Sequence, residues 1–281
     1  MLEQLVKRLA YNSRRLYRRW TGSLRLLPDF IIIGGQKCGT TSLYHYLNQH
    51  PQVHMSHGKE LHYFDLNFDK GQTWYRTQFP LASQKTYAQQ IKKTHFLTGE
   101  SSPYYMFHPH TPRRMAEMLP EVKLIVLLRN PIDRAYSHYY HQVKKKRETL
   151  PFAEAIDREA EWLTQEMQKI LADEYYYSYN HHHLAYLARS IYIDQLLYWE
   201  KFFERCQMLV LNSEMLFSNP TATFDQVLDF LGLSRWYPPA FKQHNVNTYP
   251  NIDPTTRHWL QDYFALPNQR LFKYLGAEFD W

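Results

Sequence analysis

Three short apolar runs in the chain have the length of buried strands, and each is followed by a segment with helical spacing. The runs are Phe30–Ile33, Lys123–Leu128 and Met208–Leu211. Apolar runs of this length are typical of strands in a sheet that is covered on both faces. The segments after them predict helices over Thr40–Asn48, Ile132–Lys146 and Thr221–Leu231, the last ended by Gly232. This alternation predicts an α/β fold of three layers, in which helices flank a central parallel β-sheet.

Two further segments complete the predicted organisation. Phe96–Thr98 is another strand candidate, and Leu184–Phe203 predicts one long helix before the third apolar run. The chain shows no linker, and no segment repeats with a period typical of solenoid proteins. We therefore predict one domain over residues 29–281, preceded by an N-terminal extension over residues 1–28.

The composition narrows the class of protein. The 281 residues include only two cysteines, Cys38 and Cys206, so a disulfide framework is excluded and a reducing compartment, the cytoplasm, is expected. No stretch reaches the ~18–20 apolar residues that a membrane-spanning helix needs. Residues 1–28 hold seven Lys and Arg side chains against one Glu, which accounts for the whole net charge of +6. The rest of the chain is neutral, so a broad nucleic-acid-binding face is not expected.

The N-terminal extension combines its cations with one apolar face. Leu2, Leu5, Val6 and Leu9 recur at helical spacing. A basic amphipathic helix can lie on an anionic membrane surface, dock on a partner or remain solvated. The extension lacks the continuous apolar core followed by small residues that a signal peptide has. Peripheral membrane contact through residues 1–27 is therefore one of three interpretations.

The glycine-rich turn between the first strand and its helix predicts an anion site. A helix N-terminus after such a turn presents free backbone N–H groups and the positive end of the helix dipole. Gly34 and Gly39 have the spacing of the phosphate-binding motif G-x-x-x-x-G-K-[ST]. Thr40 replaces the lysine of that motif, and Lys37 lies inside the loop instead. Three hydroxyl residues, Thr40–Ser42, add donors, although the turn alone also fits an ordinary strand-to-helix connection.

A second anion-binding pattern follows the strand predicted over Lys123–Leu128. Arg129 comes directly after this strand, at the edge where ligands bind in open α/β sheets. A nucleoside triphosphatase often carries a magnesium-binding aspartate at this position. With Arg129 there instead, the sequence favours a site for phosphates that are not bound to a metal ion. Ser137 lies eight residues on, and an arginine with a hydroxyl suits a terminal phosphate. The alternative is a surface arginine paired with Asp133. We expect the two loops to be neighbours at one sheet edge.

Together these residues resemble the sulfotransferases that use 3′-phosphoadenosine-5′-phosphosulfate (PAPS), most closely the heparan sulfate N- and 3-O-sulfotransferase domains. Residues 30–42 are similar to the family's 5′-phosphosulfate loop, and residues 124–137 are similar to its 3′-phosphate motif. Lys59–Asp65 is similar to the segment with the catalytic glutamate, and Glu100–Tyr104 to the segment after the second strand. The C-terminal part from Tyr249 is similar as well. The resemblance covers residues 29–281 and implies a P-loop-like fold.

The resemblance implies transfer of a sulfuryl group from PAPS to a hydroxyl or amine of an acceptor, a carbohydrate, without a metal ion. Such a transfer needs a base for the acceptor and positive charge at the leaving phosphate. Glu60 is the implied base and Lys37 the implied cation, although Glu60 could also be a solvated loop residue paired with Lys59. His62 is a second acid/base, an acceptor contact or a packed residue. The residues implied to bind the donor are Gly35, Gln36, Lys37, Cys38, Gly39, Thr40, Thr41, Ser42, Arg129, Ser137 and Tyr192.

Two positions depart from the family pattern. The stretch His244–Thr248 stands where eukaryotic members carry a basic Lys-Gly-Arg loop, and Lys242 and His244 are the nearest substitutes. Ser101 stands where the 3-O-sulfotransferases have a basic residue, which argues against an acidic acceptor. The family's disulfide near the C-terminal loop and its membrane anchor are not found either, and the resemblance with these departures implies a cytosolic, bacterial-type relative of those enzymes.

Two other functions stay open at this stage. One is a P-loop kinase of a small metabolite, against which the displaced Lys37 argues. The other is a non-catalytic, membrane-associated nucleotide-binding protein that uses the basic extension. Three adjacent histidines, His181–His183, are interpreted as plain surface or as a polar aromatic surface near the acceptor, since neighbouring side chains on a helix diverge by about 100° and do not converge on one ion. Cys38 is read as a small packed residue rather than a reactive thiolate.

Overall fold

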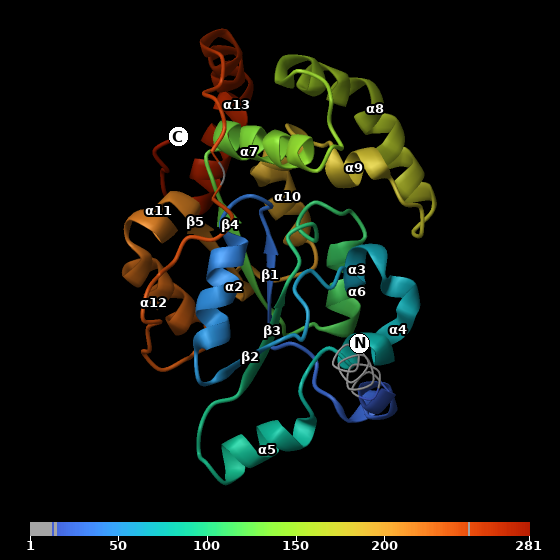
Figure 1. Cartoon of the computed structure of the whole chain (residues 1–281), viewed down its shortest axis with the longest axis vertical. Coiled ribbons are helices and arrows are strands. Elements are labelled where there is room, and N and C mark those ends of the chain that lie inside the picture. The colour runs from blue at the N-terminus through green and yellow to red at the C-terminus, as the bar shows by residue number, and fades with distance from the viewer. Residues whose placement is uncertain (1–12, 14–15, 247) are drawn as a thin grey trace, which may run out of the picture.

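The computed structural model describes residues 13, 16–246 and 248–281, and its centre is a sheet of five parallel strands (Figure 1). The order of the strands across the sheet is β2-β3-β1-β4-β5. The strands are β1 (Phe30–Gly34), β2 (Val53–Met55), β3 (Leu97–Ser101), β4 (Lys123–Leu128) and β5 (Met208–Asn212).

Helices and short 3₁₀ turns connect the strands and cover the sheet. The α-helices are α2 (Thr40–Gln49), α3 (Tyr63–Leu66), α4 (Gly71–Arg76), α5 (Ala82–Gln90), α6 (Thr111–Met118), α7 (Pro131–Lys144), α8 (Phe152–Ala172), α9 (Tyr179–His183), α10 (Tyr192–Trp199), α11 (Ser213–Ser218), α12 (Pro220–Leu231) and α13 (Pro254–Leu275). The 3₁₀ turns are η1 (Gly22–Leu24), η2 (Phe68–Lys70), η3 (Ala188–Ser190) and η4 (Arg205–Gln207).

Side chains that alternate along the strands divide the core between two faces of the sheet. Ile31 packs in a cluster that includes Trp199 of α10 and residues of α6 and α13. Ile32 packs in the opposite cluster with Leu43 of α2 and residues of α12. Because successive strand side chains point to opposite faces, both faces of an all-apolar strand are buried. The three-layer α/β fold predicted from the sequence is confirmed (Figure 1).

The segment Leu184–Phe203 does not form the single helix that its spacing predicts. It contains η3 and the shorter helix α10. The buried carboxylate of Glu159, on α8, accepts hydrogen bonds from the backbone N–H groups of residues 186–188, at 2.7–2.8 Å. These bonds hold the chain in a turn there, and this long-range anchor overrides the local helical pattern.

Most of the predicted apolar face of the N-terminal extension, Leu2 to Leu9, lies outside the described residues. Residues 16–20 are helical, and Trp20 there is 80% exposed. Arg25 is buried and donates a hydrogen bond to the carbonyl of Phe79, at 2.7 Å. Within the described part of the chain, none of the helices combines the length and apolar character needed to cross a membrane.

Candidate active site

The turn after β1 is shaped by backbone contacts that a glycine permits. Gly39 precedes α2 with φ of 90°, and a Cβ added there would lie 2.9 Å from the ring of Phe217. Both the left-handed backbone and the close ring require glycine at this position. The N–H of Gly35 donates to the carbonyl of Leu127 at 2.6 Å, which fixes the turn beside β4. The side chain of Lys37 reaches a cavity at the N-terminus of α2.

The ammonium group of Lys37 lies near other cations. Burial and the nearby guanidinium of Arg129 lower the pKa of Lys37 to about 8. Two cations that repel each other in this way favour an anion between them, because the anion restores the charged form of the amine.

Arg129 follows β4 and is placed by the start of α7. The side chain of Asn130 caps this helix by accepting from the N–H groups of residues 132 and 133. The hydroxyl of Tyr192 donates to the carbonyl of Arg129 at 2.9 Å. Asp133 pairs with Arg257 at 2.8 Å, and Arg129 lines the same cavity as Lys37. The alternative that makes Arg129 a surface partner of Asp133 is therefore wrong.

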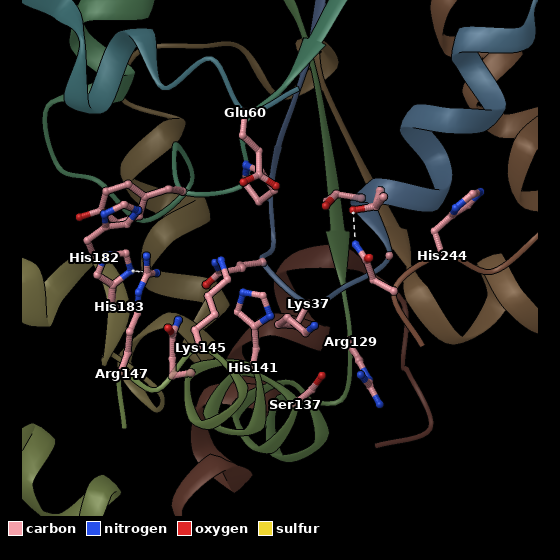
Figure 2. Close-up of a pocket in the computed structure, with 18 of the residues that line it drawn as sticks. Lys37, Glu60, Arg129, Ser137, His141, Lys145, Arg147, His182, His183 and His244 are labelled. Carbon is pink, nitrogen blue, oxygen red and sulfur yellow. Dashed lines mark hydrogen bonds between the residues drawn. The ribbon is translucent and has the colours of Figure 1, made fainter. Parts of the chain in front are cut away.

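The two loops predicted to bind anions meet at one cavity of about 400 Å³ (Figure 2). β1 and β4 are adjacent and parallel, so their carboxyl ends bring both loops to the same edge of the sheet. The predicted site residues that line this cavity are Gln36, Lys37, Gly39, Thr40, Thr41, Glu60, Arg129 and Ser137. The remaining four, Gly35, Cys38, Ser42 and Tyr192, are buried and do not line it. Their contact with a donor stays a prediction.

Cys38 and Tyr192 are buried next to the residues that line the cavity and contact each other. Burial raises the pKa of the Cys38 thiol to about 11, and its sulfur lies 3.8 Å from the hydroxyl of Tyr192. Cys38 is fully buried, so its interpretation as a packed residue is confirmed. The raised pKa disfavours the reactive thiolate form.

Glu60 extends into the cavity from the loop between β2 and α3. Its carboxylate accepts from Lys59 at 2.9 Å, and the same ammonium donates to Thr41 at 2.8 Å. Burial is the largest effect and opposes ionisation of Glu60, but the charge and hydrogen bond of Lys59 and the charges of His62 and Lys145 together lower the pKa of the carboxyl. Glu60 is thus ionised, paired with Lys59 and 46% exposed, while it also lines the cavity. The catalytic role of Glu60 stays a prediction.

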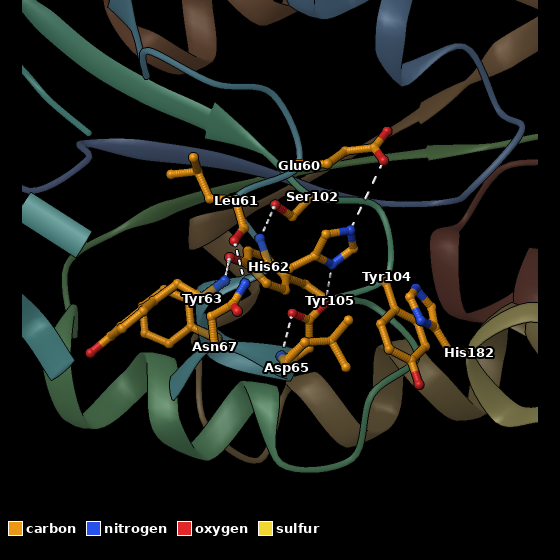
Figure 3. Close-up of polar contacts among 12 residues, drawn as sticks. Glu60, Leu61, His62, Tyr63, Asp65, Asn67, Ser102, Tyr104, Tyr105 and His182 are labelled. Atoms are coloured by element: carbon orange, nitrogen blue, oxygen red, sulfur yellow. Dashed lines mark hydrogen bonds and ion pairs between the residues drawn. The ribbon is translucent and has the colours of Figure 1, made fainter. Parts of the chain in front are cut away.

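His62 lies beside Glu60 and is oriented by a buried acid (Figure 3). Its Nδ1 lies 2.8 Å from the Asp65 carboxylate, and its Nε2 lies 4.0 Å from that of Glu60. Burial would lower the pKa of His62, but the charge and hydrogen bond of Asp65 raise it overall. The ring is therefore more readily protonated than an ordinary histidine, with its Nε2 edge toward Glu60.

The plain-surface interpretation of the three adjacent histidines is wrong, because they are buried or half-buried. His181 is buried, with its ring nitrogen 2.7 Å from the hydroxyl of Tyr104. His182 stacks on the ring of Tyr104, with 4.4 Å between the centroids, and lines the cavity with His183. Burial and nearby arginines lower the pKa of His183 to about 4 and that of His182 still further. Both rings are therefore neutral at pH 7.

Two cations that sequence reasoning missed line the same side of the cavity as these histidines. Figure 2 shows Arg147, His182 and His183 gathered on one side, with Arg129 and His244 on the other. Arg147 donates to His183 at 3.1 Å, and Lys145 lies nearby at the end of α7. The run of basic residues 144–147 was the available signal, but the sequence did not show that the end of α7 faces the cavity.

Arg189 is a third missed residue and connects two walls of the cavity. It donates to the side chain of Gln36 and to the carbonyls of His181 and His182, each at 2.7 Å. Burial lowers the pKa of Arg189 to about 10, which still leaves it charged at neutral pH. No sequence signal marked this residue, because it falls within the segment predicted as one long helix.

The C-terminal loop closes the cavity near the N-terminus of α2. The backbone N–H of His244 donates to the hydroxyl of Ser42 at 2.9 Å, and the His244 ring stacks on His45, with 4.2 Å between centroids. His244 lines the cavity, whereas Lys242, the other predicted substitute for a basic loop, is not among its lining residues. Among the described residues, no group of three or more His, Cys, Asp or Glu side chains is arranged to hold a metal ion.

Comparison with known proteins identifies the class to which this fold and cavity belong. The chain belongs to the sulfotransferase domain family, whose model matches residues 27–261, and the protein is a sulfotransferase. The resemblance drawn from the two anion-binding motifs is confirmed.

Named relatives extend this assignment over most of the chain. The chain is 27% identical to the membrane-associated sulfotransferase kil1 of Dictyostelium discoideum, over 92% of this chain and 68% of the relative. It is 30% identical to human heparan sulfate glucosamine 3-O-sulfotransferase 3B1, over 91% of this chain and 65% of that protein. The crystal structure of a sulfotransferase from Alicyclobacillus acidocaldarius superposes with a TM-score of 0.67 at 29% identity, covering 90% and 98% of the two chains. The chain thus spans about two thirds of the length of the two named relatives.

Proposed function

We propose that this sulfotransferase moves the sulfuryl group of PAPS to a hydroxyl of a carbohydrate. One observation carries the proposal: Lys37 and Arg129, from the ends of two adjacent parallel strands, line a single cavity. In this proposal Lys37 and the N-terminus of α2 bind the 5′-phosphosulfate, and Arg129 with Ser137 binds the 3′-phosphate. The two groups of donors suit the two charged ends of one nucleotide.

The residues that line the cavity supply what the reaction requires. The acceptor oxygen attacks sulfur as the bond from sulfur to the 5′-phosphate oxygen breaks, and the acceptor's proton passes to Glu60. Lys37 stabilises the charge that develops on the leaving phosphate oxygen, the usual role of a preorganised cation. The products are a sulfate ester and 3′-phosphoadenosine 5′-phosphate (PAP), so each bond formed has a matching bond broken.

Transfer of labelled sulfate tests this function. The protein is incubated with PAPS labelled in its sulfuryl group and an extract of glycans from its own organism, with lipids assayed in parallel. Label in the glycan fraction is the expected result. The kinase alternative would instead give thermal stabilisation by ATP with magnesium and none by PAP. Stabilisation by PAP without transfer to any acceptor would favour the non-catalytic alternative.

The charge of the cavity favours an acceptor that carries an anionic group. Glu60 is the one carboxylate among the residues that line it, against four cations. Lys37 and Arg129 are assigned to the donor, which leaves Lys145 and Arg147. Ser101, whose sequence position argued against an acidic acceptor, is fully buried and does not line the cavity. We infer that an acidic glycan, with a carboxylate or sulfate near the reacting hydroxyl, is the acceptor class.

Replacing Lys145 and Arg147, the two cations not assigned to the donor, should weaken acceptor binding selectively. In the double variant Lys145→Gln and Arg147→Gln, we expect KM for an acidic glycan to rise about tenfold, because one or two charge-assisted contacts are lost. The kcat and the affinity for PAP should change little. The matched control removes equal charge from the exposed Lys144 and Lys146, which do not line the cavity. An equal rise in KM for the control, or for a neutral glycan, would refute a specific anion contact.

We also propose that the N-terminal extension makes peripheral membrane contact, in a protein of the cytoplasm. A relative is named as membrane-associated, and Leu16, Tyr17 and Trp20 are exposed beside arginines at the described end of the extension. Exposed aromatic and apolar side chains among cations suit an anionic lipid surface.

Vesicle sedimentation checks this contact. Deleting residues 1–15 together with Trp20→Glu should abolish sedimentation with vesicles that contain anionic lipid, while PAP affinity is retained. Deletion through residue 27 is a poorer test, since it also removes the buried Arg25. Unchanged sedimentation of the variant would remove the proposal.

A further inference from the structure

The loop that carries Glu60 has an unfavourable backbone. Glu60 and His62 have φ angles of 58° and 50°, in the left-handed region that residues other than glycine rarely adopt. Such a conformation persists only where surrounding groups hold it. The positions of both side chains in the cavity therefore depend on whatever fixes the backbone from Glu60 to Tyr63.

Two hydroxyl groups accept hydrogen bonds from this backbone (Figure 3). The hydroxyl of Ser102 accepts from the N–H of His62 at 3.3 Å, and that of Tyr105 accepts from the N–H of Tyr63 at 2.8 Å. The N–H of Glu60 donates to a backbone carbonyl of β3 at 2.9 Å. Both hydroxyls must keep a lone pair toward the loop for these bonds to exist.

One buried carboxylate determines how those hydroxyls are oriented. Glu100, on β3, is fully buried, and its oxygens accept from Ser102 at 2.9 Å and from Tyr105 at 3.1 Å. Tyr75 of α4 donates to the same carboxylate. An ionised carboxylate only accepts hydrogen bonds, so all three hydroxyls turn their hydrogens toward it. The lone pairs of Ser102 and Tyr105 then face the N–H groups of the loop.

We propose that Glu100 is a positioning residue, whose carboxylate holds Glu60 and His62 in place through Ser102 and Tyr105. The inference rests on the proposed function of Glu60 as the base. Glu100 is fully buried and does not line the cavity, so it acts only through the loop.

We call the hydrogen bonds from Glu100 through Ser102 and Tyr105 to the loop the relay. The relay also makes the activity depend on pH. Burial raises the pKa of Glu100 to about 7, against the effect of its three hydroxyl donors. Asp65 and His62 on the loop side and the two tyrosines are the other titratable groups that face it. When Glu100 is protonated, its carboxyl group gains a hydrogen that it must donate. One of the hydroxyls must then accept from Glu100 and turns away from the loop. The kcat should therefore fall as the pH decreases through 7.

Glu100→Gln tests the relay, because the amide keeps the shape and introduces donors. We expect kcat to fall about 10- to 100-fold, as for a small displacement of a catalytic group, with PAP affinity changed less than about twofold. Amide hydrogen exchange at His62 and Tyr63 should become faster, and the decrease of kcat below pH 7 should diminish. Tyr75→Phe is the matched control, compared well above pH 7, where Glu100 is ionised: it removes a hydroxyl bond to the same carboxylate that does not reach the loop, so kcat and exchange should change little there. Because this hydroxyl lowers the pKa of Glu100, its loss should only move the decrease of kcat to higher pH.

The exchange measurement separates this inference from the proposed function. If Glu60 is not the base, the Glu60 variants stay active, yet Glu100→Gln still loosens the loop. Unchanged exchange at His62 and Tyr63 would overturn the relay, as would equal effects of Tyr75→Phe. Should Glu100→Gln fail to fold, the double variant Ser102→Ala and Tyr105→Phe, which removes both links, must reproduce the loss of kcat and the faster exchange; normal values there would also overturn it.

Discussion

Replacing Glu60 with Gln is expected to lower kcat for sulfuryl transfer by about 10²–10⁴-fold, the usual contribution of a positioned general base. The amide occupies the same space but cannot take the acceptor's proton. Because Lys37 and Arg129 are unchanged, PAP should bind with nearly its normal affinity. Steady-state turnover with saturating PAPS and acceptor, together with calorimetric titration of PAP, measures the two quantities separately.

A matched control for Glu60→Gln is Glu121→Gln, since Glu121 is exposed and outside the cavity. The control should keep normal turnover. Lys59 lowers the pKa of Glu60. Glu60 should therefore become protonated, and activity should be lost, only at a pH below the usual pKa range of glutamate. Near-normal turnover of Glu60→Gln would show that the base lies elsewhere, and His62 would then be the residue to replace.

Replacing Arg129 with Ala is expected to weaken PAP binding by about 10- to 100-fold, which corresponds to losing a charge-assisted hydrogen bond pair of ~1.5–3 kcal/mol. Adenosine 5′-phosphosulfate lacks the 3′-phosphate, so its binding should weaken far less. The ratio of the two losses isolates the contact with the 3′-phosphate from general effects on the cavity.

Arg257→Ala is the control for Arg129→Ala. Arg257 pairs with Asp133 in the first turn of α7 but does not line the cavity. Its replacement removes one positive charge near the same helix and should leave both affinities nearly unchanged. Equal losses for PAP and adenosine 5′-phosphosulfate in Arg129→Ala would contradict the assignment of Arg129 to the 3′-phosphate.

The sequence predicted that Lys37 and Arg129 meet at one cavity, because the chemistry of each lies in a continuous segment. A glycine-rich turn and an arginine each follow an apolar strand, and parallel strands bring their carboxyl ends to one edge. Once β1 and β4 are neighbours, Lys37 and Arg129 must lie near each other. The sequence motifs and the strand order both place the two loops at the same edge of the sheet. The prediction that these loops are neighbours therefore needed no knowledge of side-chain packing.

The other side of the cavity depends on contacts between distant segments. Arg189 joins Gln36 to the carbonyls of His181 and His182 only after Glu159 has fixed the turn at residues 186–188. That anchor connects residues almost thirty positions apart in sequence. A periodicity argument cannot detect it, which is why the histidines were placed on the surface and the helix over Leu184–Phe203 was drawn too long.

A crystal structure of the protein with PAP would show whether Lys37 and Arg129 hold one nucleotide at its two ends. We expect the Lys37 ammonium to lie within hydrogen-bond distance of the 5′-phosphate and the Arg129 guanidinium to lie within that distance of the 3′-phosphate. A nucleotide bound in the reverse direction, or bound outside this cavity, would contradict this expectation.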